Sequence, residues 1–214
     1  MSEMLNSGRP SLRATKRERT ASEMVSNAVR LFRKKGVRAA SLAEIARASG
    51  VSQATLFNYF PNKGALAEAW VRGEIDAAIA RATRELGDHG LRSAMRGLSR
   101  ELGVSATGDR EIRLEAWHAT GRAARDVLSQ THPLVRAIAS EQERERVRAD
   151  LGATTLGEMI RDAIEGGLIE ALRAALDEVE AAKRIRARVD LVLDAARKRN
   201  ERVAAPTASS RIRS

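Results

Sequence analysis

Hydrophobic residues recur at three- and four-residue spacing along most of the chain, and no stretch shows the alternating pattern of a half-buried β-strand. The first such run predicts a helix that starts near Thr15 or Thr20 and ends at Gly36. Each of these threonines precedes a glutamate by three residues, which is the spacing of a capping box. The apolar positions of this run are Ala21, Met24, Val25, Ala28, Leu31 and Phe32. The pattern as a whole predicts an all-α fold.

Two short helices are predicted next. Ser41 stands three residues before Glu44, which marks a capped helix over residues 42–48. Ser52 is placed to cap a second short helix over residues 53–59.

A longer helix is expected from Asn62 or Lys63 toward Leu86, and the helical pattern continues to the end of the chain. The further segments are 91–102, 110–128, 134–165 and 171–200, with candidate breaks at Gly87–Gly90, Gly103–Asp109, Ser129–Pro133 and Gly166–Gly167. The last segment carries an apolar stripe made of Leu172, Leu176, Val179, Ala182, Ile185, Val189, Val192 and Ala196. Such a stripe on a charged helix must pack against another element.

The net charge of +10 is concentrated at the two ends of the chain. Residues 1–73 hold 13 Lys and Arg against 5 Asp and Glu, and residues 197–214 hold 6 against 1. Residues 74–196 hold 19 against 22. The basic N-terminal block favours nucleic acid as a partner, because Lys and Arg release counterions condensed on phosphates. A merely solubilising surface is the other interpretation of this charge.

Composition excludes several classes of function. Cysteine is absent, which removes disulfides, thiolate catalysis and Cys-based zinc sites. No apolar run approaches the ~18–20 residues needed to cross a bilayer, and the first fifteen residues lack the apolar core of a secretion signal. We therefore expect a soluble cytoplasmic protein without a membrane partner. No phosphate-binding loop, dinucleotide turn or nucleophile–base pair is recognisable, so we do not expect an enzyme.

The most specific signal is residues 41–60, SLAEIARASGVSQATLFNYF. Ala46 supplies a small contact where two short helices cross, and Gly50 tolerates the positive φ of the turn between them. The apolar residues that hold the pair together are Leu42, Ile45, Val51 and Leu56. This spacing predicts a helix-turn-helix whose second helix enters the major groove. Its exposed positions are expected to be Ser52, Gln53, Ala54, Thr55, Asn58 and Tyr59.

Residues 16–72 resemble the DNA-binding domain of the TetR family of transcriptional regulators. The first helix ends in LFRKKG, and the recognition helix runs through an aromatic pair into YFPNKGAL, a segment that other helix-turn-helix families lack. The resemblance covers about a quarter of the chain. It implies a three-helix DNA-binding domain followed by a helical domain that binds a ligand and forms the dimer.

The resemblance implies roles for individual residues of the DNA-binding domain. Ser41 would meet a phosphate, and Gln53 would read a base edge through its amide. Ala54 and Thr55 would offer methyl groups to thymine, or a hydroxyl to phosphate in the case of Thr55. The phosphate-anchoring pair would be Tyr59 and Lys63.

Two positions depart from the family pattern. Phe57 replaces the tyrosine of many members, and Ala43 replaces a base-reading arginine of some, so these two contacts are missing.

Two basic segments lie outside this pattern, one at each end of the chain. The basic residues of the N-terminal arm and the tail would either contact DNA or only solubilise the chain. They are Arg9, Arg13, Lys16, Arg17 and Arg19 in the arm, and Arg197, Lys198, Arg199, Arg211 and Arg213 in the tail.

The rest of the chain is expected to form a dimer and to sense a ligand. The resemblance implies that the last two helices of each subunit form a four-helix bundle, a role that suits the 172–196 stripe unless the stripe packs only within the monomer. An unidentified small-molecule effector would release the operator, and no cofactor is expected. Only Trp117 among the aromatic residues lies in this part of the chain. The candidate pocket residues are Met95, Arg113, Trp117, His118 and Met159.

The sequence thus predicts a homodimeric, ligand-released repressor that binds a palindromic operator. The expected divisions are a flexible basic arm (1–15), a DNA-binding domain (16–72), a ligand-binding and dimerisation domain (73–198) and a disordered basic tail (199–214). Two alternatives stay open. One is a helical interaction protein with a degenerate helix-turn-helix. The other is a helical metalloenzyme, because Glu115 and His118 have the Glu-x-x-His spacing of di-iron proteins, although no second such pair exists.

Overall fold

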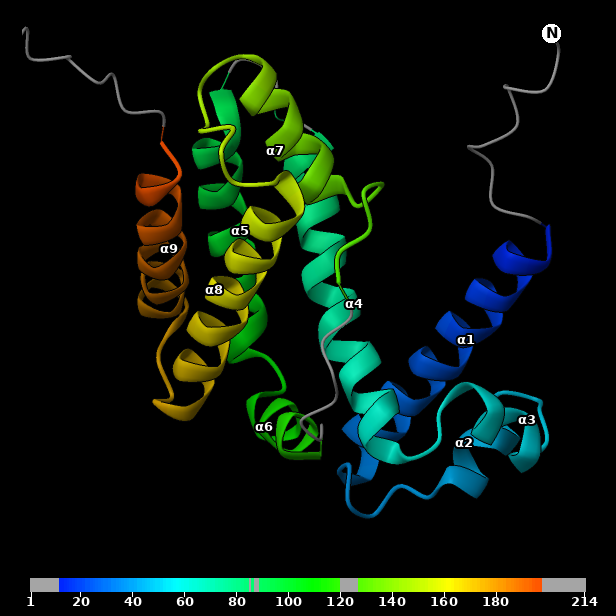
Figure 1. Ribbon diagram of the computed structural model, residues 1–214. Coiled ribbons are helices and arrows are strands. Elements are labelled where there is room, and N and C mark those ends of the chain that lie inside the picture. Colours follow the sequence, from blue (N-terminus) through cyan, green and yellow to red (C-terminus); the bar gives the residue numbers. More distant parts are fainter. Residues whose placement is uncertain (1–11, 85, 87–88, 120–126, 198–214) are drawn as a thin grey trace, which may run out of the picture.

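The computed structural model describes residues 12–84, 86, 89–119 and 127–197, and within these ranges the chain is helical (Figure 1). The helices are α1 (Leu12–Lys35), α2 (Leu42–Ala48), α3 (Gln53–Tyr59), α4 (Lys63–Arg84), α5 (Gly90–Thr107), α6 (Arg110–Ala119), α7 (Pro133–Glu143), α8 (Ala153–Arg173) and α9 (Glu178–Ala195). The one extended pairing in the described part is an isolated bridge between Val147 and Arg197. The predicted all-α fold is confirmed. None of the described helices is long and apolar enough to cross a membrane.

Helix α1 begins earlier than the sequence predicted. It starts at Leu12, so Thr15 and Thr20 lie inside it rather than at its N-terminus. The Thr20 hydroxyl donates to the Lys16 carbonyl oxygen at 2.9 Å, one turn back. The predicted start was wrong because a Thr and a Glu three residues apart also share one face inside a helix. Residues 12–15 of the predicted flexible arm are helical, and residues 1–11, with Arg9, lie outside the described residues.

Helix α4 joins the two parts of the molecule. Its first half buries Leu66 and Trp70 near α1, and its second half buries Ile75 and Ile79 among the body helices. Figure 1 shows α4 running from the α1–α3 end of the molecule into the bundle of α5, α7, α8 and α9. A displacement of α4 would therefore affect both the DNA-binding end and the body helices.

Helix α9 packs against α5 and α8 with its apolar side. Ile185 and Val189 of the predicted stripe are buried inside the subunit, whereas Val179 is 63% exposed. Much of the stripe is therefore used within the monomer, the alternative that the sequence left open.

The predicted helix break at Gly166–Gly167 is wrong, whereas a break does fall within the predicted stretch Gly103–Asp109, after Thr107. Helix α5 continues through Gly103, and α8 continues through Gly166 and Gly167. These glycines permit close packing instead of ending a helix. A Cβ at Gly167 would lie 2.6 Å from the Ile185 Cα, and one at Gly103 would lie 2.9 Å from the Ala182 Cβ.

The predicted segment 134–165 is two helices, α7 and α8, joined by a loop over residues 144–152. The Gln142 side-chain amide donates to the carbonyl oxygens of Arg148 and Leu151, both at 2.8 Å. These two hydrogen bonds hold part of the loop against the end of α7. The predicted helix over 110–128 is helical to Ala119, and residues 120–126 lie outside the described part, as does the tail from residue 198.

Candidate nucleic-acid interface

Helices α2 and α3 form a helix-turn-helix at one end of the molecule (Figure 1). Gly50 in the turn has φ of 66°, a conformation that costs free energy for a residue with a Cβ. The Val51 N–H donates to the Ala46 carbonyl oxygen at 3.0 Å, which closes the turn. Ala46, Ile45 and Leu56 are all buried. Both helices have the predicted bounds, and the predicted turn and packing residues are confirmed.

A capping box fixes the start of α2. The Ser41 hydroxyl oxygen accepts from the Glu44 N–H at 3.2 Å, and the Glu44 carboxylate accepts from the Ser41 N–H at 3.0 Å. Lys35 at the end of α1 donates to the same carboxylate. The Lys35 hydrogen bond, together with those from Ser41, lowers the pKa of Glu44 to about 2. Glu44 thus stays ionised over the physiological pH range and ties α1 to α2.

Helix α3 presents unpaired polar groups to solvent. The Ser52 hydroxyl oxygen accepts from the Thr55 N–H at 3.1 Å, and the two hydroxyls lie 2.8 Å apart, so both side chains serve the N-cap. Gln53 and Asn58 are exposed, and their amides make no hydrogen bond within the described residues. Phe57 between them along the helix is 58% exposed. This face therefore offers two free amides and one aromatic ring.

The two residues expected to anchor phosphates, Tyr59 and Lys63, contact different parts of the DNA-binding end. The guanidinium carbon of Arg17 on α1 lies 5.2 Å from the centroid of the half-buried Tyr59 ring. The Lys63 ammonium donates to the carbonyl oxygens of Val37 (3.0 Å) and Arg38 (2.6 Å). An ammonium has three N–H donors, so one remains for an external acceptor such as a phosphate. Lys63 also anchors the loop that leads into α2.

The same loop is held from the body by Glu115 of α6. One oxygen of its carboxylate accepts from the Val37 N–H at 2.8 Å, and the other accepts from the Arg38 N–H at 2.7 Å. Beside this clamp, Arg33 of α1 pairs with Asp109 at 2.6 Å. The clamp could not be predicted from the sequence, because Glu115 is 78 residues from Val37 and 77 from Arg38 and no local pattern marks such a contact.

The clamp also uses one residue of the Glu115-x-x-His118 pair on which the metalloenzyme alternative rests. The Glu115 carboxylate is engaged with backbone N–H groups, while His118 one turn later is exposed. Among the described residues, no three His, Asp or Glu side chains gather as a metal site would require. The Glu115–His118 spacing is therefore accounted for by contact with the DNA-binding end.

Replacing Glu115 by Gln is expected to loosen this loop. One amide group would then face the backbone N–H donors in place of a carboxylate oxygen, and a hydrogen bond to a charged group contributes ~1.5–3 kcal/mol. Hydrogen exchange at the amides of Val37 and Arg38 should accelerate roughly 10- to 100-fold. Glu111→Gln on the same helix, at an exposed position, is the control and should leave both rates unchanged. Equal exchange rates in the parent and Glu115→Gln would contradict the clamp.

The candidate pocket residues lie in different environments. Met95 and Arg113 are buried, Trp117 is half-buried, and His118 and Met159 are exposed. Met95 and Arg113 thus lie in the interior, whereas His118 and Met159 face solvent.

Arg113 has a defined set of contacts in the interior. It pairs with Glu74, donates to the Gly108 carbonyl oxygen at 3.0 Å, and lies 5.1 Å from the centroid of the Trp70 ring. Arg113 thus joins α6 to α4.

Comparison with known proteins agrees with this geometry. Residues 25–70 match the family model described as bacterial regulatory proteins, tetR family. Residues 25–70 therefore form a DNA-binding domain of the TetR type. No curated protein matches the sequence.

Solved TetR-family structures share the fold over most of the chain. The repressor QsdR of R. erythropolis has a TM-score of 0.60 at 14% identity, covering 89% of this chain and 99% of its own. FadR of Thermus thermophilus, solved with lauroyl-CoA, has a TM-score of 0.56 at 22% identity, covering 84% and 96%. RolR, solved with resorcinol, has a TM-score of 0.52 at 22% identity, covering 86% and 90%. The TetR-type architecture therefore extends through the helical body.

Proposed function

We propose that this chain is a homodimeric repressor of the TetR family that acts on chromosomal DNA in the cytoplasm and leaves its operator when a small molecule binds. The observation that carries the proposal is the capped helix α3, whose Gln53 and Asn58 amides face solvent without partners. Amides of this kind can bond an adenine edge in the major groove. The surrounding residues 1–73 carry the excess of positive charge that phosphates require.

The proposed DNA contacts fall into two groups. Gln53, Ala54 and Asn58 would face base edges, since they are exposed on α3. The caps and anchors at the ends of the short helices would face phosphates. These are Ser41, Ser52, Thr55, Tyr59 and Lys63.

The outward side of α8 and α9 is the proposed dimer surface. Leu191 is 72% exposed and Met159 is 43% exposed, although both are large apolar residues. Arg188 of α9 pairs with Glu170 of α8 at 2.9 Å. Burial of these apolar side chains against a second copy would remove them from water. A two-fold dimer would then place two α3 helices in successive major grooves.

Release of the operator on small-molecule binding is supported by two of the structurally similar proteins. FadR was solved with lauroyl-CoA and RolR with resorcinol, and both share this fold with TM-scores above 0.5. An effector needs only a modest preference for the state that does not bind DNA, on the order of 1–3 kcal/mol, to release an operator.

The rival function, a helical interaction protein with a degenerate helix-turn-helix, is not favoured. Both caps and the Gly50 turn are intact. The two unpaired amides of α3, on Gln53 and Asn58, also remain available for base edges.

Selection of bound fragments from a random DNA pool tests the proposal. We expect an inverted repeat whose half-site centres lie about one helical turn apart, roughly 34–36 Å. Affinity should fall steeply as salt is raised, because the phosphate contacts release counterions. Recovery of unrelated fragments only, with no repeat, would contradict both the DNA-binding and the dimer proposals.

A further inference from the structure

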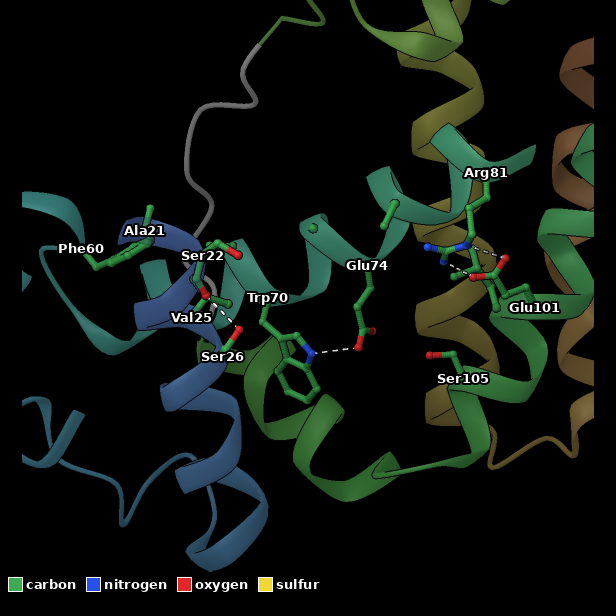
Figure 2. A pocket seen from close by; sticks show the side chains of 14 residues that line it. Ala21, Ser22, Val25, Ser26, Phe60, Trp70, Glu74, Arg81, Glu101 and Ser105 are labelled. Carbon is green, nitrogen blue, oxygen red and sulfur yellow. Dashed lines mark hydrogen bonds and ion pairs between the residues drawn. The ribbon is translucent and has the colours of Figure 1, made fainter. Parts of the chain in front are cut away.

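A cleft of about 690 Å³ opens between α1 of the DNA-binding domain and the body helices α4 and α5. Figure 2 shows Ala21, Val25 and Phe60 on one side of it, Trp70 and Glu74 of α4 in the middle, and Arg81, Glu101 and Ser105 on the other side. The cleft lies between the two parts of the molecule rather than within the body bundle. None of the five candidate pocket residues lines it.

A glycine of α4 lies on the wall of the cleft. Gly73 lines it, and a Cβ added at Gly73 would meet no atom within 4 Å. Gly73 is helical and does not have positive φ, so neither packing nor backbone conformation requires glycine there. A glycine inside a helix costs about 1 kcal/mol relative to alanine. A larger side chain at this position would therefore extend into open space in the cleft.

The charges that line the cleft are already paired. Glu74 accepts from the Trp70 indole N–H at 2.9 Å and from Arg113, and Arg81 pairs with Glu101. Glycine, alanine and aromatic side chains supply most of the remaining wall. The Ser105 hydroxyl makes no hydrogen bond within the described residues. An occupant would therefore meet an apolar wall, an aromatic ring and a free hydroxyl, but no unpaired charge.

We propose that this cleft is a regulatory ligand site for an uncharged, ring-containing small molecule with a hydrogen-bonding group. The regulatory effect rests on the proposed DNA-binding function, whereas binding of the small molecule to the cleft does not. An occupant would touch α1 and α5 at once, so it would set the distance between the DNA-binding domain and the body. Glu74 on its floor is bonded to Arg113, two residues before the Glu115 clamp on the same helix. Helix α6 thus connects the cleft to the α1–α2 loop, in addition to the direct contact of the cleft with α1.

Binding is tested first, without DNA, using benzyl alcohol as the probe. Its addition should shift the NMR signal of the Trp70 indole N–H saturably, with a dissociation constant on the order of 1 mM for so small a ligand. Gly73→Leu should abolish the shift by filling the cleft. Gly97→Leu is the matched control and should retain the shift, because Gly97 is also a helical glycine with open space around its Cβ position but lies outside the cleft. A linear or absent shift in the parent, or an unchanged one in Gly73→Leu, would overturn the site.

Regulation is tested with a covalently placed ring. The chain has no cysteine, so Ala77→Cys gives a single thiol in the cleft. Benzyl methanethiosulfonate transfers its benzylthio group to that thiolate and releases methanesulfinate. We expect the labelled protein to bind the selected DNA at least tenfold more weakly, with recovery after reduction by dithiothreitol. Ser93→Cys, exposed on α5 outside the cleft, should bind equally well with and without the label.

The two proposals fail in different ways. Unchanged affinity of the labelled Ala77→Cys protein would refute regulation from the cleft. Failure of the unlabelled parent to bind any DNA would instead refute the proposed function, and the benzyl alcohol titration would still decide whether the cleft binds a ligand.

Discussion

Gly167→Ala is expected to lower the midpoint of thermal unfolding by roughly 4–8 °C, the shift that a loss of about 2 kcal/mol produces in a chain of this size. The added Cβ would lie 2.6 Å from the Ile185 Cα and 3.2 Å from its Cγ1. Backbone cannot rotate away as a side-chain end can, so α8 and α9 would have to separate. Overpacking of this kind costs ~1–3 kcal/mol, occasionally more, and outweighs the helix propensity that alanine gains over glycine.

The neighbouring glycine gives a matched control. A Cβ at Gly166 would meet only the end of the Arg188 side chain, at 3.2 Å, and that end can move. Gly166→Ala should therefore keep the helix-propensity gain of up to about 1 kcal/mol and unfold at the parent temperature or slightly above it. Calorimetry at two protein concentrations separates folding from association. Equal midpoints for the two alanine variants would contradict the close approach of α8 and α9.

The glycine pair Gly166 and Gly167 shows a limit of prediction from sequence. The two glycines predict a helix break, because glycine is a poor helix former when nothing else is known. In the fold, Gly167 lies directly against the backbone of α9, where a side chain would not fit. That partner is 18 residues further along the chain, at Ile185, and no local pattern reveals it.

The helix-turn-helix was predictable because its determinants are local. Ser41 bonds Glu44 and Ser52 bonds Thr55, each three residues away, so the caps fix the starts of both helices within a short window. The turn between the two helices depends on a single residue, Gly50, which adopts a positive φ. The Glu115 clamp, by contrast, joins residues 77 and 78 positions apart.

The position of Lys63 shows the same division between local and distant determinants. Its place at the start of α4 follows from the motif, but its bonds to the carbonyl oxygens of Val37 and Arg38 depend on how α1 and α4 pack. Sequence reasoning could place this side chain on the right helix without showing which acceptors it reaches.

Ala54→Glu is expected to weaken operator binding at least 100-fold while leaving the fold intact. Ala54 is exposed at the second position of α3, the end that would enter the major groove. A carboxylate there would face the negative potential of the groove, and like charges juxtaposed at an interface cost several kcal/mol. The same carboxylate lies in the first turn of the helix, where it interacts favourably with the helix dipole, so unfolding should not occur earlier. Fluorescence anisotropy with the selected DNA, alongside thermal unfolding, measures both effects.

The added charge itself needs a control, because one more carboxylate lowers the affinity of any basic protein for DNA. Ser93→Glu adds the same charge at an exposed position on α5, one turn from Arg96 and in the body of the molecule. It should change operator affinity less than about threefold, since charges separated by more than a Debye length of ~8 Å are largely screened at physiological salt. Comparable losses for Ala54→Glu and Ser93→Glu would show that net charge, and not the groove-facing side of α3, governs binding. A loss confined to Ala54→Glu locates the DNA at the exposed N-terminal part of α3, next to Gln53.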